Sequence, residues 1–260
     1  MPIYDLNALY CEPEVNQISG FTDVARKLDM DALSSAYINL VEGAPRRSLN
    51  QKPYFQTGHD GFPSGDGNSN RREEHLALAL FNQSNRFDFP GGRDLNIIDY
   101  QTPLKFRQDD KGIGKIDLFG IMDNAIPAVI ELKIHGIKKG EADTPLRALL
   151  ERLAYCAIVE ANIADFTDEA QSKFNLEIIR TRPDLIVMAP SDYWHSYLSK
   201  SSAGDWLPVI ETMITEFRQK LHINIHLCSL LDADFEMGSF QKRPILKNQC
   251  HLVPIGSEKA

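Results

Sequence analysis

Apolar and polar residues alternate along two neighbouring segments, residues 113–122 and 128–135, which a short turn joins. Alternation with a period of two predicts two strands of a hairpin. In the second segment it places Glu131 and Lys133 on one face, whereas Ile130 and Leu132 point to the other. Asp117 lies in the first segment, so the hairpin is predicted to gather two carboxylates and one amine.

The pattern of apolar and polar residues also predicts the other helices and strands after residue 70. The run at residues 185–189 is wholly apolar and ends at a proline, which is typical of a central strand covered on both faces. The helices are predicted at about 70–81, 144–162, 191–199 and 206–221, and the strands at 95–106, 113–122, 128–135, 184–189, 223–230 and 250–255. This order predicts an α/β protein with helices flanking a central sheet.

The chain before residue 70 is predicted to contain little regular secondary structure. One helix is predicted there, at about residues 22–41, where apolar residues recur at helical spacing. Residues 57–70 consist largely of Gly, Ser, Asn, Asp and Pro, which form turns and cannot build a core. We therefore expect an N-terminal extension over residues 1–70 and a main domain over 71–260.

Composition narrows the function classes. The 260 residues carry a net charge of −8, so general coating of nucleic acid is not indicated and any nucleic-acid site must be a local basic patch. No apolar run is long enough for a membrane span and no secretory signal is evident, which predicts a cytoplasmic protein with no membrane partner. The four cysteines lack C-x-x-C spacing, which argues against a zinc knuckle or disulfide framework.

The charged residues of the hairpin suggest a specific chemistry. Asp117 and Glu131 offer the oxygen ligands that a hard cation prefers, and Lys133 places an ammonium beside a water that the cation would polarise. This arrangement suits phosphodiester hydrolysis. The competing interpretation is a solvated polar face on an amphipathic strand pair.

Asp117, Glu131-Leu132-Lys133 and the acidic helix upstream, in this order of elements, resemble the PD-(D/E)XK nuclease superfamily. The resemblance covers about residues 71–190 and implies a restriction-endonuclease-like αβββαβ core with a mixed central sheet flanked by helices. It also implies that Asp117, Glu131 and the backbone carbonyl of Leu132 bind Mg²⁺ or Mn²⁺. Lys133 would then orient or deprotonate the attacking water.

A glutamate of the first helix often completes this site in the family. Glu74 is preferred here because Ala77 and Phe81 continue its face, with Glu73 as the close alternative. The sequence departs from the family pattern at Ile116, where proline is common. It departs again at Glu151, which occupies the first position of a Gln-x-x-x-Tyr motif.

The resemblance implies a metal-dependent deoxyribonuclease with a role in restriction, repair or defence, although RNA remains open as the substrate. Lys138 and Lys139 directly follow the catalytic strand and are the best placed phosphate contacts. Members of the family often pair to cut both strands, so a homodimer or a larger nuclease complex is a candidate assembly. The alternative is a catalytically inactive nucleic-acid-binding or assembly module of the same fold.

Overall fold

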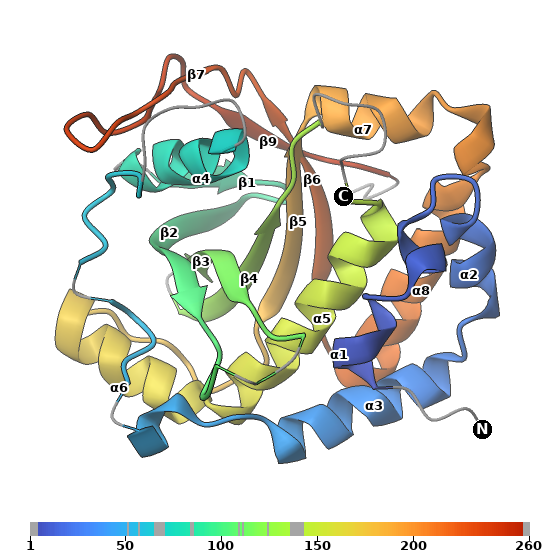
Figure 1. Ribbon diagram of the computed structural model, residues 1–260, viewed down its shortest axis with the longest axis horizontal. Helices are drawn as coiled ribbons and strands as arrows, with labels where there is room; N and C mark the ends of the chain where they lie inside the picture. The colour runs from blue at the N-terminus through green and yellow to red at the C-terminus, as the bar shows by residue number, and fades with distance from the viewer. Residues whose placement is uncertain are drawn as a thin grey trace.

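Seven strands form one mixed sheet in the described part of the chain, with the order β1-β2-β3-β4-β5-β6-β9 (Figure 1). The computed structural model describes residues 5–50, 52–56, 58–64, 71–83, 86–108, 110, 112–123, 125–135 and 143–256. The strands are β1 (Phe87–Phe89), β2 (Arg93–Pro103), β3 (Lys115–Met122), β4 (Ile126–Leu132), β5 (Asp184–Pro190), β6 (Ile225–Leu231) and β9 (His251–Pro254). Strands β1 to β4 are antiparallel neighbours, β4, β5 and β6 run parallel, and β9 is antiparallel to β6.

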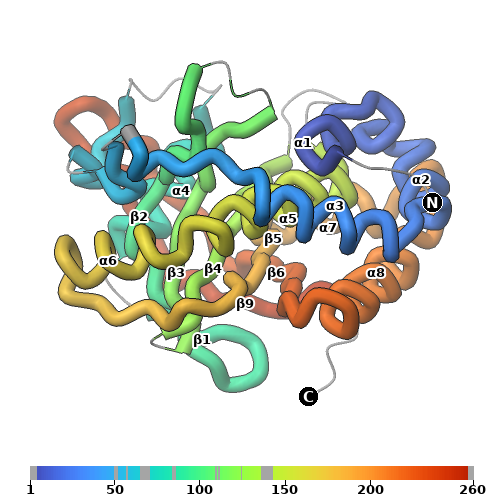
Figure 2. Tube along the Cα trace, turned by 90° about the horizontal axis from the view of Figure 1, so that it is seen from below, coloured from blue at the N-terminus to red at the C-terminus, as the bar shows by residue number. Residues whose placement is uncertain are grey.

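Helices cover both faces of this sheet. Helix α4 (Arg72–Asn82) lies on one face, next to a small ribbon formed by β7 (Phe235–Glu236) and β8 (Ile245–Leu246). The other face carries α3 (Met30–Gly43), α5 (Pro145–Ala161), α6 (Ile163–Phe174), α7 (Ser191–Leu198) and α8 (Trp206–Leu221), together with the short α1 (Leu6–Leu9) and α2 (Phe21–Lys27). Figure 2 shows α3 lying alongside α5, and α6 continuing from the end of α5. Short 3₁₀ turns lie at Pro13–Asn16, Arg47–Asn50 and Ser201–Ala203.

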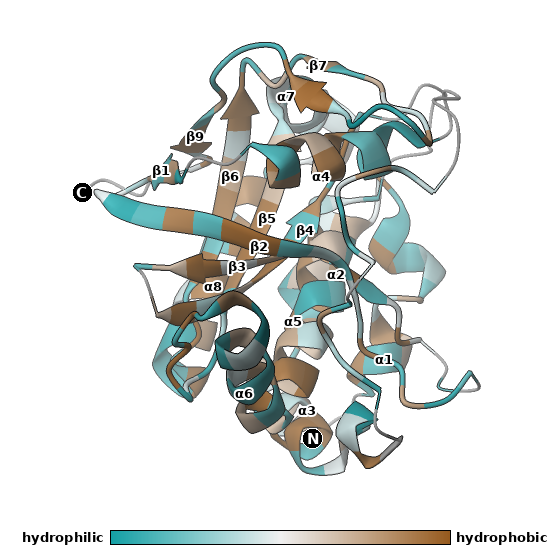
Figure 3. Cartoon of the chain, turned by 90° about the vertical axis from the view of Figure 1, so that its left-hand side faces the viewer, coloured by the Kyte–Doolittle hydropathy of each residue, from teal (hydrophilic) through white to brown (hydrophobic). Residues whose placement is uncertain are grey.

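Two hydrophobic clusters explain why the central strands are apolar throughout. In β4, Val129 packs into the cluster under α5, whereas Ile130 packs into the cluster under α4. In β5, Leu185 and Ile186 divide in the same way. The brown colour of the central strands in Figure 3 reflects this double burial. A mixed α/β architecture with helices on both faces of the sheet is thus confirmed.

Helix α5 is the central helix of the larger cluster. Thr144 caps its start, because its side-chain oxygen accepts a hydrogen bond from the backbone N–H of Arg147 at 3.2 Å, and Pro145 occupies the first position. Nearly every residue of α5 is buried. The helix therefore fixes the position of any side chain that it points at the sheet.

The chain before residue 57 shares this core. The single helix predicted at residues 22–41 is wrong: α2 ends at Lys27 and α3 begins at Met30. Asp29 separates them, because its carboxylate caps α3 by accepting from the backbone N–H of Asp31 and of Ala32, each at 3.0 Å. Buried side chains of this part, including Phe21 and Leu33, pack into the same cluster as α5 and α8.

Several helices and strands were not predicted from the sequence. Helix α6 follows α5 after a single intervening residue, Asn162, but the helix was predicted to end there and no element was predicted for the residues of α6. Strand β1 has three residues and β7 and β8 have two each, which is too short for a periodic signal. These short strands extend or flank the predicted sheet without changing its centre.

Leu33→Ala should show that the N-terminal helices contribute to the global stability. Leu33 is fully buried, so its truncation should lower the free energy of unfolding by about 2–5 kcal/mol. Urea unfolding monitored by tryptophan fluorescence tests this, since Trp194 and Trp206 lie on α7 and α8. Ile38→Ala is the matched control, because Ile38 lies on the same helix with 46% exposure and should change stability by less than about 0.5 kcal/mol. An unchanged tryptophan transition in Leu33→Ala would contradict a shared core.

Candidate functional site

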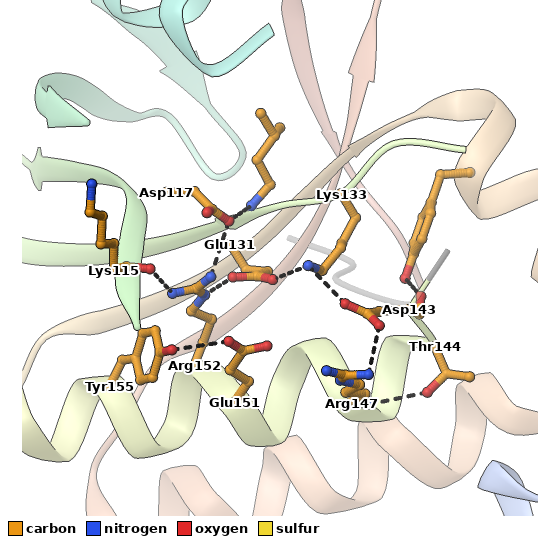
Figure 4. A network of polar contacts seen from close by, with 12 residues as sticks. Lys115, Asp117, Glu131, Lys133, Asp143, Thr144, Arg147, Glu151, Arg152 and Tyr155 are labelled. Atoms are coloured by element: carbon orange, nitrogen blue, oxygen red, sulfur yellow. Dashed lines mark hydrogen bonds and ion pairs between the residues drawn. The ribbon is translucent and has the colours of Figure 1, made fainter. Parts of the chain in front are cut away.

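The hairpin of β3 and β4 brings Asp117 close to the end of β4. The register pairs Leu118 with Ile130, and the backbone N–H of Leu132 donates to Oδ2 of Asp117 at 3.1 Å. Glu131 lies on the face that α5 covers, and Lys133 follows one residue after the end of β4. The side chains of Asp117, Glu131 and Lys133 therefore gather on one side of the sheet (Figure 4).

The carboxylate of Glu131 lies at the centre of the group. Its side chain has no exposed surface, and it is held between two cations: Nζ of Lys133 contacts Oε1, and Nε of Arg152 contacts Oε2. A buried carboxylate is tolerated only with such compensation, because removal from water strongly disfavours the charged form. Both oxygens of Glu131 thus face a positive charge.

Arg152 joins the two carboxylates. This residue of α5 is 3% exposed, and its Nη2 lies 3.1 Å from Oδ2 of Asp117. Its Nη1 donates to the backbone carbonyl of Lys115 at 3.0 Å, and the guanidinium carbon lies 4.5 Å from the centre of the Tyr155 ring. The guanidinium consequently bridges Asp117 and Glu131 from the side of the helix.

Lys133 is held from its other side by Asp143. Nζ of Lys133 lies 3.1 Å from Oδ2 of Asp143, whose Oδ1 contacts Arg147 and the side-chain amide of Asn16, each at 3.1 Å. Asn16 belongs to the N-terminal segment, so that segment helps to fix the cluster. Burial lowers the pKa of Lys133, but the carboxylates of Glu73 and its other acidic neighbours outweigh this and raise the pKa above its ordinary value. Lys133 is therefore a fixed ammonium in this arrangement.

The two glutamates at the start of α4 differ in their surroundings. Glu74 accepts from the backbone N–H and hydroxyl of Ser64 at 3.2 and 2.9 Å and lies 3.4 Å from Arg71. Burial raises the pKa of Glu73 to about 7, and Glu73 interacts electrostatically with Lys133 and Asp117. Of the two, Glu73 interacts electrostatically with the charged cluster, whereas the preferred Glu74 is hydrogen-bonded to Ser64 before the helix.

A pocket of about 200 Å³ opens beside the cluster and is lined by Arg71, Glu73, Glu74, Ala77, Gln101 and Asp117. Gln101 reaches it from β2, where its φ of 49° puts a non-glycine residue in the left-handed region. Carboxylate and amide oxygens are suitable ligands for a hard cation, and Mg²⁺ commonly uses one or two carboxylates and retains water molecules. Among the residues that the structure describes, however, no three His, Cys, Asp or Glu side chains are grouped closely enough to hold a metal ion by themselves.

Two predicted phosphate contacts, Lys138 and Lys139, lie outside the described residues. Leu132 ends β4 with a buried side chain, next to Asp117 as the hairpin predicts.

Glu151, which replaces the glutamine of the Gln-x-x-x-Tyr motif, accepts a hydrogen bond from the hydroxyl of Tyr155 at 3.1 Å. Burial raises the pKa of Glu151 above its ordinary value.

Sequence reasoning missed Arg152 and Asp143. A signal for Arg152 was present: it follows Leu149 by three residues and precedes Cys156 by four, so it interrupts a buried apolar stripe of α5. A charged residue on such a stripe needs a buried partner. Asp143 has no comparable signal, because it directly precedes the cap residue of α5 and its role depends on tertiary contacts with Lys133 and Asn16.

Comparison with known proteins gives no match: no family model fits the chain, and no curated protein and no solved structure resembles it significantly. No helix in the described ranges has the length and apolar character that a bilayer crossing requires.

Glu131→Gln tests whether the cluster depends on this buried carboxylate. Removing its charge leaves Lys133 and Arg152 without their shared partner, so the free energy of unfolding should fall by about 3–5 kcal/mol. Glu74→Gln is the control. Glu74 lines the pocket beside the cluster, and its partly exposed ion pair with Arg71 should contribute less than about 1 kcal/mol to the free energy of unfolding. Chemical denaturation of both variants at neutral pH is the measurement. Equal losses would show that Glu131 has no special structural role.

Proposed function

We propose that the protein is a metal-dependent nuclease that hydrolyses phosphodiester bonds, most naturally in DNA. In this proposal the segment from α4 through β2, β3, β4 and α5 to β5 is a restriction-endonuclease-like core. The observation that carries it is the convergence of Asp117, Glu131 and Lys133 at the end of the β3–β4 hairpin, beside a pocket that Glu73 also lines.

The donor chemistry fits a magnesium or manganese ion. Asp117 and Glu73 line the pocket and would supply its carboxylate oxygens, and Glu131 and the carbonyl of Leu132 are the further ligands that the resemblance implies. When bound, such an ion supplies positive charge that lowers the pKa of a water molecule and stabilises the phosphoryl oxygens. The chain itself contributes the acidic pocket wall and the adjacent ammonium.

Lys133 is the residue suited to position the water. Its Nζ is anchored between Glu131 and Asp143, so the ammonium has a defined direction and keeps a donor for a third partner. Preorganised donors of this kind stabilise the charge that develops on phosphoryl oxygens. Lys138 and Lys139 remain our proposal for contacts to the neighbouring phosphates.

One observation favours a second candidate, a catalytically silent nucleic-acid-binding or assembly module. Arg152 already forms ion pairs with Asp117 and Glu131, so these carboxylates have a positive partner without a metal ion. A silent module would bind DNA without divalent-dependent cleavage. The two candidates therefore differ in one assay.

Wild-type protein should cleave linear, circular or single-stranded DNA in the presence of Mg²⁺ or Mn²⁺, with RNA as the alternative substrate. Asp117→Asn and Lys133→Met should each reduce the cleavage rate by at least about 100-fold, because they remove a proposed ligand and a charge-stabilising donor. DNA binding in Lys133→Met should remain detectable in a filter or gel-shift assay.

Asp168→Asn is the matched control for the lost carboxylate, because Asp168 is 73% exposed on α6. It should retain wild-type activity. Cleavage that persists at full rate in Asp117→Asn would remove the proposed mechanism. Binding without any metal-dependent cleavage would favour the silent module.

A further inference from the structure

Arg152 lies in the site, but it is not part of the predicted sequence motif and has no role in the proposed hydrolysis. Its guanidinium contacts Oδ2 of Asp117 and Oε2 of Glu131, the two side chains proposed as metal ligands. A side chain with one positive charge thus lies between the carboxylates that a divalent cation would share (Figure 4).

An ion and the guanidinium cannot both be bound to Oδ2 of Asp117 and Oε2 of Glu131. Mg²⁺ binds its oxygen ligands at about 2.0–2.1 Å and tolerates little distortion. Nη2 of Arg152 lies 3.1 Å from Oδ2 of Asp117, so an ion bound to that oxygen and to Oε2 of Glu131 would lie in contact with the guanidinium. Two positive charges at this separation repel each other strongly where little water screens them. The ion and the guanidinium therefore compete for the same two oxygens.

The surroundings of Arg152 allow it to give up these oxygens while it stays buried. Its Nη1 also donates to the carbonyl of Lys115 at 3.0 Å, and its guanidinium lies over the ring of Tyr155. Neither contact involves the two acids. Tyr155 is itself fixed, because its hydroxyl accepts from the backbone N–H of Gly114 at 2.8 Å and donates to Glu151.

We propose that Arg152 is a built-in cation that occupies the position between Asp117 and Glu131 in the metal-free protein and must release both carboxylates before a divalent cation binds them. The proposal rests on the proposed function in that it takes these carboxylates as the metal ligands. It assigns Arg152 a role in setting the metal affinity. In the absence of metal, the positive charge of Arg152 offsets the repulsion between these two acids.

Manganese binding to Arg152→Gln tests this directly. Without the guanidinium, Mn²⁺ should bind at least about tenfold more tightly than to wild type in isothermal titration calorimetry, because a competing charge is lost. The double variant Arg152→Gln with Glu131→Gln should lose this gain. Equal or weaker binding by the single variant, or unchanged tight binding by the double variant, would overturn the proposal.

The rise in Tm on addition of Mn²⁺ provides a second readout. A purely structural role of Arg152 would not make this rise larger in the variant than in wild type. Arg152→Gln should lower the Tm in metal-free buffer, and saturating Mn²⁺ should raise the Tm of this variant more than that of wild type, because the ion replaces the lost charge. Arg182→Gln is the control. Arg182 bonds the carboxylate of Glu160, so its removal does not leave two neighbouring carboxylates that an ion could bind together. Mn²⁺ should not restore its stability. Rescue of both variants, or of neither, would contradict the proposal.

Arg152→Lys keeps the test available if the glutamine variant does not fold. A lysine ammonium cannot bridge two carboxylates in the forked manner of a guanidinium, so Mn²⁺ should again bind more tightly than to wild type, though less tightly than to the glutamine variant where that folds. Affinity equal to wild type would overturn the proposal. These measurements do not use cleavage. Absence of nuclease activity would therefore refute the proposed function while leaving the metal competition at Arg152 to be decided by binding.

Discussion

The buried carboxylate of Glu131 is the constraint on which the rest of the site depends. It has no exposed surface, so its charge requires compensation inside the protein. Lys133 supplies one partner from just beyond the end of β4, and Arg152 supplies the other from α5. Each of these cations then reaches a further acid, Asp143 or Asp117. One desolvated group thereby organises a network that spans a strand, a hairpin and a helix.

The position of α5 gives this network its precision. The helix is buried along most of its length between the sheet and α3, and its start is fixed by Thr144. The backbone at Arg152 cannot move far without disturbing that packing, since close-packed interiors tolerate small displacements poorly, so only its side chain can change partners. The same rigidity holds Tyr155 against the backbone of Gly114, where no side chain fits: a Cβ on Gly114 would approach the tyrosine hydroxyl to 2.6 Å.

The sequence predicted the centre of the fold better than its periphery. Strands β3, β4 and β5 carry strong periodic or continuous apolar patterns, and the structure has them close to the predicted bounds. The same alternation correctly assigned Glu131 to the face opposite Ile130. Periodicity does not report tertiary partners, so it could not reveal that Asp143 contacts Lys133 or that Glu73 interacts electrostatically with the cluster. Nor could it show that Asp29 divides one helix into two, because a capping aspartate also fits the polar side of a continuous helix.

The N-terminal helices have a consequence for any attempt to dissect the chain. They cover apolar parts of α5 and α8, and Asn16 contacts Asp143. A fragment starting at α4 would present that surface to water as one continuous patch, and extensive exposed apolar areas drive self-association. Such a fragment would also lose a hydrogen bond that steadies the ammonium of the site. The glycine-rich segment before α4 is therefore a poor place to truncate, although its composition resembles that of an interdomain linker.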